Sequence, residues 1–112
     1  MRFMIIVKAT RDSEAGVMPE DHLIAQMCKY HEELAQAGML LDASGLQPSA
    51  KGWRIKYSGD KTSFVDGPFT ETKELIAGYV IVSAASLDDA GQRAEEYLHV
   101  VEAEEVDLRE LE

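Results

Sequence analysis

The sequence predicts one α+β domain over residues 1–112, in which two strand–helix–strand units frame an inserted β-hairpin. Three observations lead to this fold class. Apolar residues recur at helical spacing in two segments, and an apolar run of strand length precedes each. An alternating segment, the turn Gly59-Asp60 and a second extended segment are typical of a hairpin. The continuous apolar run from Tyr79 to Ala85 indicates a central strand that is buried on both faces.

The first third of the chain predicts a strand, a long loop and a helix. Residues 2–8 hold an apolar run between charges, which favours a strand. Residues 9–18 predict a loop that is long for a compact domain, and such loops often carry function. Pro19 suits the first helical position, and an amphipathic helix is expected over 19–37, with Gly38 as its C-terminal cap. Its predicted apolar stripe consists of Leu23, Ile24, Met27, Tyr30, His31, Leu34 and Ala35.

A second strand is predicted over residues 39–46, and the hairpin follows it. If Gly59-Asp60 forms a two-residue turn, residues 53–58 pair with residues 61–66. The opposed pairs are then Ser58–Lys61, Tyr57–Thr62, Ile55–Phe64 and Trp53–Asp66. Because opposed residues share a face, Asp66 is expected to project from the same apolar side as Trp53, Ile55, Tyr57 and Phe64.

The last third is predicted to hold a turn, two further strands and a second helix. Residues 70–74 favour one helical turn capped by Thr70, and residues 76–85 favour the central strand. Ser86 suits the N-cap of a second amphipathic helix. A last strand is expected over roughly 104–110.

This order of elements, with both helices on one face of an antiparallel sheet, is the ferredoxin-like βαββαβ arrangement with an inserted hairpin. Such a sheet leaves its second face bare, and the central strand has apolar residues on both of its faces. We therefore expect the hairpin to cover part of this face and a second subunit to cover the rest, which predicts a homodimer.

Composition limits the class of partner. Acidic residues number 21 against 11 basic residues, so the formal net charge is −10, and this charge disfavours nucleic acids and anionic membranes as partners. No segment approaches the ~18 apolar residues of a membrane span. The N-terminus is expected to be a strand and not a signal peptide. A lone Cys28 cannot form an internal disulfide and is expected to be a small helix hydrophobe. These features predict a cytoplasmic protein.

Asp66-Gly67-Pro68-Phe69, followed by residues 70–79, resembles the hallmark of DGPF-domain proteins within the YCII-related family. Residues 4–10 and 45–49 are similar to the same group, so the resemblance spans about residues 1–90. It implies ferredoxin-like subunits that pair into a dimeric α/β barrel. The chain departs from the family pattern at residues 97–102, where a Cys-Pro and a Gly-rich loop would be expected.

The resemblance also implies a range of functions. Most members are uncharacterised bacterial proteins, often encoded beside extracytoplasmic-function sigma factors. Some relatives use a His-Asp pair in lyase- or dehalogenase-type chemistry, with the histidine near the start of the first helix. The matching position here is Met27, and His22 and His31 lie on either side of it. Only Asp66 matches a motif position outright.

Asp66 and His31 are the catalytic candidates. A carboxylate on an apolar face is partly desolvated, which favours its protonated form and suits a general acid or base. The alternative is that Asp66 caps the amides of the following turn. His31 either exchanges a proton with a substrate or with Asp66, or is a hydrogen-bonded residue at the edge of the core.

Ligand-binding candidates fall into two groups. Cations would hold an anionic ligand, and aromatic side chains would line an apolar pocket, although surface and core positions respectively are the ordinary places for them. The cations are Lys8, Arg11, Arg54 and Lys73, and the aromatic residues are Tyr30, Trp53, Tyr57 and Phe69. Three scattered histidines and the lack of nucleotide motifs predict neither a metal nor a cofactor.

These residues support alternative functions. The first is an enzyme that acts on a small, aromatic or enolisable metabolite by cofactor-free acid–base catalysis, in a pocket between the hairpin, the first helix and the partner chain. The second is a non-catalytic ligand-binding or regulatory module that acts on a sigma factor through the acidic surface. A dimeric scaffold with a vestigial pocket is the third.

Overall fold

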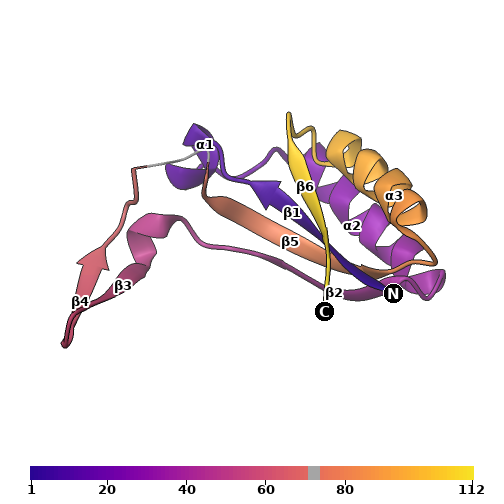
Figure 1. The fold of residues 1–112 in the computed structure, drawn as a ribbon. Helices are drawn as coiled ribbons and strands as arrows, with labels where there is room; N and C mark the ends of the chain where they lie inside the picture. Colours follow the sequence, from indigo (N-terminus) through magenta and orange to yellow (C-terminus); the bar gives the residue numbers. More distant parts are fainter. Residues whose placement is uncertain (71–73) are drawn as a thin grey trace.

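The computed structural model describes residues 1–70 and 74–112 (Figure 1). In chain order the elements are β1 (Arg2–Lys8), α1 (Arg11–Glu14), α2 (Asp21–Gln36), β2 (Leu40–Gly45), the 3₁₀ helix η1 (Ser49–Lys51), β3 (Trp53–Ser58), β4 (Lys61–Asp66), β5 (Ile76–Ser83), α3 (Leu87–Val100) and β6 (Val106–Glu110). Four strands form an antiparallel sheet in the order β2-β5-β1-β6, and β3 pairs with β4 separately. This mixed α+β architecture is consistent with the predicted ferredoxin-like arrangement.

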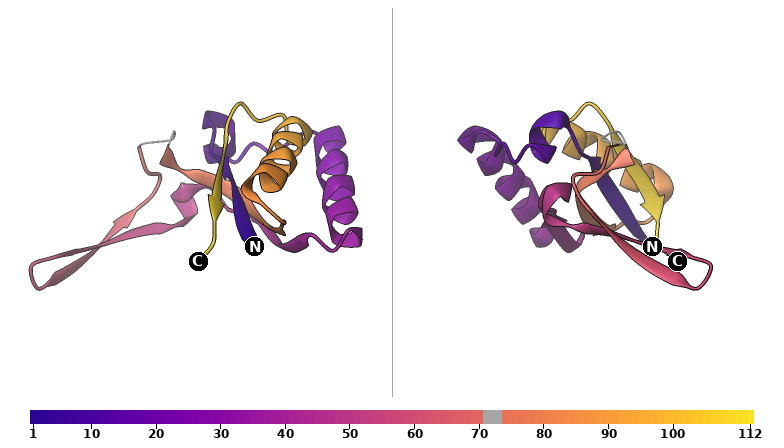
Figure 2. Two further views of the ribbon diagram at one scale, coloured as in Figure 1. Left: turned by 45° about the vertical axis from the view of Figure 1, so that its right-hand side comes forward. Right: turned by 90° about the vertical axis from the view of Figure 1, so that its left-hand side faces the viewer.

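The hydrophobic core lies between one face of the sheet and the helices α2 and α3, which both cover that face (Figure 2). Alternate residues of the two central strands point into it, as the period of two of a strand requires. The core residues are Phe3 and Ile5 of β1, Tyr30 and Leu34 of α2, Val80 and Val82 of β5, Ala84, and Ala90, Ala94 and Tyr97 of α3.

The helix ends match the sequence prediction closely. Gly38 has a φ of 73°, and the Met39 amide donates to the Leu34 carbonyl at 2.9 Å, so the predicted glycine cap is confirmed. Ser86 accepts a hydrogen bond from the Asp89 amide at 3.1 Å and is the predicted N-cap of α3. Helix α2 begins two residues after Pro19 because Glu20 is extended, with a ψ of 154°.

Helix α2 buries less of its apolar stripe than the spacing predicts. Only Tyr30 and Leu34 are buried, while Ile24 and Cys28 are exposed. The helix extends beyond the sheet in its first half (Figure 2), where His22 Nε2 lies 3.3 Å from Glu102 Oε2 but no apolar residue is buried.

Residues 9–18 are not a loop throughout, which corrects the sequence prediction. Thr10 and Ser13 cap one another: the Ser13 amide donates to Thr10 Oγ1 at 3.0 Å, and the Thr10 amide donates to Ser13 Oγ at 2.8 Å. This capping box opens the short helix α1. The helix brings Glu14 toward the segment that follows β2.

The hairpin has the predicted register but not the predicted position. Its cross-strand pairs are confirmed, including Trp53 opposite Asp66 and Ile55 opposite Phe64. It does not cover the sheet; it projects beyond the edge of the sheet at which β5 begins (Figures 1 and 2). The reason is local, because the chain leaves β2 at Gly45 and enters β5 at Ile76 on the same end of the sheet.

The second face of the sheet is bare of helices, as expected from the apolar central strand (Figure 2). Met4 and Ile6 of β1 lie opposite Ile81 and Tyr79 of β5 on this face, and all four side chains are partly exposed. We call these four residues the open sheet face. Coverage of this face by a second subunit stays a prediction.

The predicted helical turn over 70–74 falls largely on residues 71–73, which lie outside the described part of the chain. Within residues 1–70 and 74–112, no helix combines the length and the apolar character that a membrane span requires.

Candidate functional site

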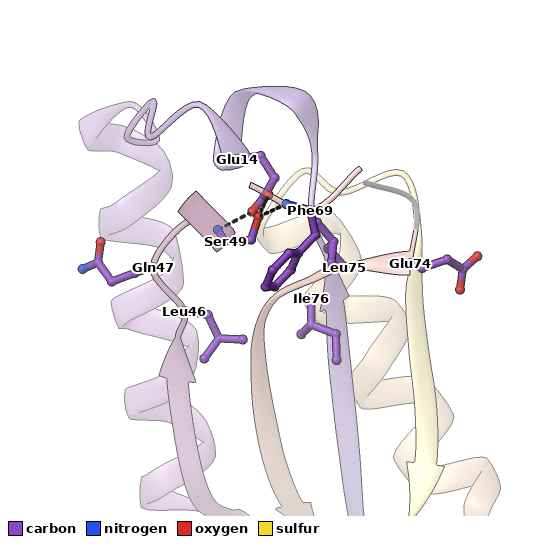
Figure 3. Close-up of a pocket in the computed structure, with 8 residues that line it drawn as sticks. All are labelled: Glu14, Leu46, Gln47, Ser49, Phe69, Glu74, Leu75 and Ile76. Carbon is purple, nitrogen blue, oxygen red and sulfur yellow. Dashed lines mark hydrogen bonds between the residues drawn. The ribbon is translucent and has the colours of Figure 1, made fainter. Parts of the chain in front are cut away.

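A hollow of about 390 Å³ lies at the base of the hairpin (Figure 3). It forms where α1, the segment after β2 and the segment that enters β5 meet. The lining residues are Glu14, Leu46, Gln47, Ser49, Phe69, Glu74, Leu75 and Ile76. The wall is therefore mainly apolar, with a carboxylate and a hydroxyl group at one end.

Three segments distant in sequence are joined at that end by Ser49. Its amide donates to Glu14 Oε2 at 2.9 Å, and its hydroxyl group donates to Glu14 Oε1. The Phe69 amide in turn donates to Ser49 Oγ at 2.9 Å. We call this set, Glu14, Ser49 and the Phe69 amide, the Ser49 clamp; it is visible as dashed lines in Figure 3.

Gly67 allows the motif backbone to approach this clamp closely. A Cβ atom at Gly67 would overlap the Ser49 carbonyl oxygen, so no side chain fits there. The Gly67 amide donates to the Gly52 carbonyl at 3.1 Å, and the following Gly67–Pro68 peptide bond is cis. The glycine of the motif is thus required by packing.

Phe69 forms one wall of the hollow and is half-buried. The Arg54 guanidinium carbon lies 4.3 Å from its ring centroid, which is a cation–π contact. Glu74 lies at the rim, and its carboxylate points away from Phe69 (Figure 3). Phe69 is thus the one predicted ligand-binding residue that the described structure places in the wall of this hollow.

Asp66 ends β4 near the hollow but does not line it. Its side chain is exposed, so the expected desolvation is wrong for the single chain: the apolar hairpin face that carries Asp66 is itself open to water. Among the described residues, no hydrogen bond reaches its carboxylate. The alternative, that Asp66 caps the amides of the following turn, is not seen either, because the Gly67 amide donates to Gly52 and the Phe69 amide to Ser49.

His31 and Tyr30 lie between α2 and α3, on the helical side of the sheet. His31 Nε2 is 3.0 Å from Tyr97 Oη, and the two rings stack with centroids 5.5 Å apart. Burial lowers the pKa of His31 and raises that of Tyr97 to about 12. Tyr30 donates to Glu96 Oε2 at 2.7 Å, and burial raises its pKa. Of the two alternatives for His31, the structure therefore shows the hydrogen-bonded residue at the core edge, and no pairing with Asp66 occurs among the described residues.

The remaining candidates are dispersed. Lys8 pairs with Asp107 at 3.1 Å, and that bond raises the lysine pKa. Arg11 is exposed at the start of α1, and Trp53 is exposed on the hairpin. Lys73 lies outside the described residues. The helix beside the hollow is α1, and not the predicted helix over 19–37.

Glu14 and Ser49 were not predicted as site residues. Both lie in segments that the sequence singled out for other reasons, Glu14 in the long loop and Ser49 in the motif over 45–49. The reciprocal Thr10 and Ser13 pattern is the signal that would have placed α1 and thereby Glu14. Within the described part of the chain, no group of three or more His, Cys, Asp or Glu side chains could hold a metal ion.

Comparison with known proteins agrees with the motifs. A family model described as the YCII-related domain matches residues 1–107. An uncharacterised protein of Rhizobium meliloti (strain 1021) is 30% identical over 71 residues. That alignment covers 63% of this chain and 57% of the relative, so the chain spans little more than half the length of that protein.

Proposed function

The chain belongs to the YCII-related domain family, and from this premise we propose that it is a homodimeric enzyme that moves a proton on a small, largely apolar metabolite without a cofactor. The ligand binds in the hollow at the base of the hairpin, and Glu14 is the proton carrier there. Asp66 is the second candidate carboxylate, since it is the first residue of the motif whose Phe69 forms one wall of the hollow. His31 is left out because it is hydrogen-bonded to Tyr97 between α2 and α3 and does not line the hollow.

One observation carries this proposal: a half-buried carboxylate lies at the end of an apolar hollow. Ser49 donates one hydrogen bond to each Glu14 oxygen, and each carboxylate oxygen has two lone pairs, so each can accept a further donor from a ligand. The clamp also fixes the direction of the carboxylate, which is what a general acid or base requires. The ligand should therefore combine an apolar body with an O–H, an N–H or an acidic C–H group.

The homodimer is proposed from the open sheet face. Met4, Ile6, Tyr79 and Ile81 present an apolar surface at the centre of the sheet, and large exposed apolar faces mark interaction sites. A second copy would cover this face by sheet-to-sheet packing, as in the dimeric α/β barrel that the family resemblance implies.

Ligand screening by NMR tests the binding site. A library of small aromatic and enolisable acids, alcohols and amides is added to the ¹⁵N-labelled protein, and amide shifts are followed. We expect saturable shifts at Ser49, Phe69, Leu75 and Ile76, and a loss of affinity of about tenfold or more in Glu14→Gln. Glu33→Gln, an exposed carboxylate change on α2, is the matched control and should bind as the wild type does. Shifts confined to other surfaces would contradict the site.

Proton transfer is tested separately, with a ligand from that screen. The bound ligand is incubated in D₂O, and exchange of its acidic C–H group is followed by NMR. We expect exchange with the wild type and with Glu33→Gln, and a loss of at least about a hundredfold with Glu14→Gln, in line with general acid–base contributions. Binding without exchange would favour the non-catalytic ligand-binding module instead.

A further inference from the structure

The hairpin over residues 53–66 is fully paired but has an uncovered apolar face. Trp53, Ile55, Tyr57 and Phe64 lie on one side and are 64%, 62%, 75% and 59% exposed. We call these four residues the aromatic arm face. The Trp53 and Phe64 rings pack against each other with centroids 5.4 Å apart, so the face is ordered within itself.

A two-stranded hairpin alone in water is marginally stable at best, and it is stabilised when its apolar face packs against something. This hairpin projects away from its own sheet (Figures 1 and 2). The side chains that alternate with the arm face include Arg54, Lys56 and Lys61. Val65 also lies on this second side, so the two sides differ mainly in that all four large aromatic and aliphatic side chains of the arm face lie on one of them and all three basic side chains on the other. Such a difference is expected for a segment that is covered on one side only.

We propose that the hairpin is an arm that seats its aromatic face on a second copy of this chain. This inference rests on the proposed homodimer and adds a second contact to it, beyond the paired sheets. Charge favours this occupant: residues 53–66 carry three basic and two acidic side chains, while the chain as a whole has a net charge of −10. The arm therefore has a net charge of +1 (three basic minus two acidic side chains) and is attracted to the acidic body of another copy.

The area of the arm face is sufficient for such a contact. At about 200 Å² for a large aromatic side chain, the four residues expose on the order of 500 Å² per arm. Two reciprocal arms then contribute on the order of 1,000 Å², which is the lower bound for a specific interface before the open sheet face is added. Trp and Tyr are also the residue types that most often dominate interface affinity.

The arm also completes the environment of Asp66, which lies opposite Trp53 on the same face. In the single chain this carboxylate is exposed. Seating the arm on a second copy withdraws this carboxylate from water. The desolvation that the motif predicted would then be supplied by the partner and not by the chain itself.

Trp53 is the single tryptophan of the chain, so its fluorescence reports on the arm directly. The wild-type protein is diluted across the dissociation range while sedimentation velocity measures the monomer–dimer equilibrium. We expect a blue-shifted emission and low acrylamide quenching in the dimer. Both should change to the values of an exposed tryptophan on dilution, with the same midpoint as sedimentation.

The outcomes separate this inference from the proposed function. A dimer whose Trp53 stays exposed would overturn the arm contact and leave the dimer intact. A monomer at every concentration would overturn the proposed dimer and the arm with it. A Trp53 that is protected in the monomer would place the arm on its own chain, and that result also overturns the inference.

Two variants in one strand provide the matched comparison. Tyr57→Ser changes the aromatic arm face, and Lys56→Ser changes the adjacent residue on the opposite side. We expect the first to weaken dimerisation by about tenfold or more and the second by less than about threefold. Equal effects of the two variants would contradict a one-sided contact.

Discussion

Gly67 occupies a position where the backbone of one segment touches the backbone of another. The atom that a Cβ at this position would meet first is a carbonyl oxygen of η1, and not the flexible end of a side chain. Relief of such a contact requires a shift of the backbone that holds Ser49. The glycine of the family motif therefore has a packing role at the site, whatever chemistry the neighbouring residues perform.

Replacement of this residue is the first prediction. Gly67→Ala should lower the free energy of unfolding by about 1–3 kcal/mol or more, because overpacking against backbone forces a rearrangement. Gly91→Ala is the control, since Gly91 lies within α3 and, its own stretch of helix backbone aside, a Cβ there meets no atom of the described chain within 4 Å. That change should stabilise the helix by about 0.5–1 kcal/mol. Urea denaturation measures both, and equal effects would disprove the close approach.

The partly buried His31 predicts how stability depends on pH. Burial lowers its folded-state pKa below the ordinary value of 6.5, so the unfolded chain binds a proton more readily than the folded chain. Its contribution to stability is therefore full above about pH 6.5 and is lost as the pH falls toward the folded-state pKa. Urea denaturation at pH 7.5 and 5.5 should show a smaller loss of stability in His31→Gln than in the wild type.

A second variant identifies the cause of this pH dependence. Desolvation lowers the His31 pKa, and the Tyr97 hydroxyl group is its hydrogen-bond partner. Tyr97→Phe keeps the aromatic packing and should therefore retain most of the pH dependence. If Tyr97→Phe abolishes it as fully as His31→Gln does, the hydrogen bond and not burial is responsible.

At the scale of elements, the Ser49 clamp joins α1, η1 and the turn that follows β4. These three are short or irregular, and each buries little apolar surface of its own. A hydrogen-bonded carboxylate between them therefore contributes more to local order than it would inside a regular helix. The Phe69 amide donates a hydrogen bond to Ser49 Oγ, and this bond fixes the position of the ring that forms one wall of the hollow.

Ser49→Ala tests the clamp. The change removes the hydroxyl group between Glu14 and the Phe69 amide, and hydrogen bonds to charged groups contribute about 1.5–3 kcal/mol, so a loss of stability of about 1–3 kcal/mol is expected. Ser63→Ala, an exposed position in β4, should stay within about 0.5 kcal/mol of the wild type. Urea denaturation gives the energies, and amide hydrogen exchange should quicken at Phe69 only in Ser49→Ala. Unchanged exchange there would contradict the clamp.

At the scale of the whole molecule, two apolar surfaces face away from the core of the chain. The open sheet face lies on the side opposite α2 and α3, and the aromatic arm face lies on the projecting hairpin. The acidic net charge opposes non-specific association of copies. Specific apolar contacts are then needed to hold a dimer together.

Ile81→Ser is the prediction at this scale. Ile81 is partly exposed on the open sheet face, between Met4 and Asp42 of the neighbouring strands. Its replacement should weaken dimerisation by about tenfold or more in sedimentation velocity, as loss of a buried interface side chain does. Leu87→Ser, at an apolar residue exposed at the start of α3, should leave dimerisation unchanged. A dimer unaffected by Ile81→Ser would move the interface away from this face.

The elements of this protein follow from short-range patterns in its sequence. Alternation and turn chemistry predicted the hairpin register residue by residue, and Gly38 and Ser86 correctly marked helix ends, because strand period, turn geometry and capping depend on neighbouring residues. The motif over 66–69 likewise marked the region of the hollow. Within this motif, Gly67 packs against the Ser49 backbone and Phe69 forms a wall of the hollow. The sequence had indicated Asp66 as the main site residue.

Only the tertiary structure decided where these elements lie relative to each other. The hairpin pattern states which side chains share a face, but not whether that face meets the sheet or water, since this depends on where β2 ends and β5 begins. The proposal of Glu14 in place of Asp66 as the proton carrier likewise depends on the tertiary structure, because Glu14 reaches the hollow through contacts between distant segments. Ser49 meets Glu14 across 35 positions of sequence and Phe69 across 20, and no periodicity in the sequence encodes contacts between segments so far apart.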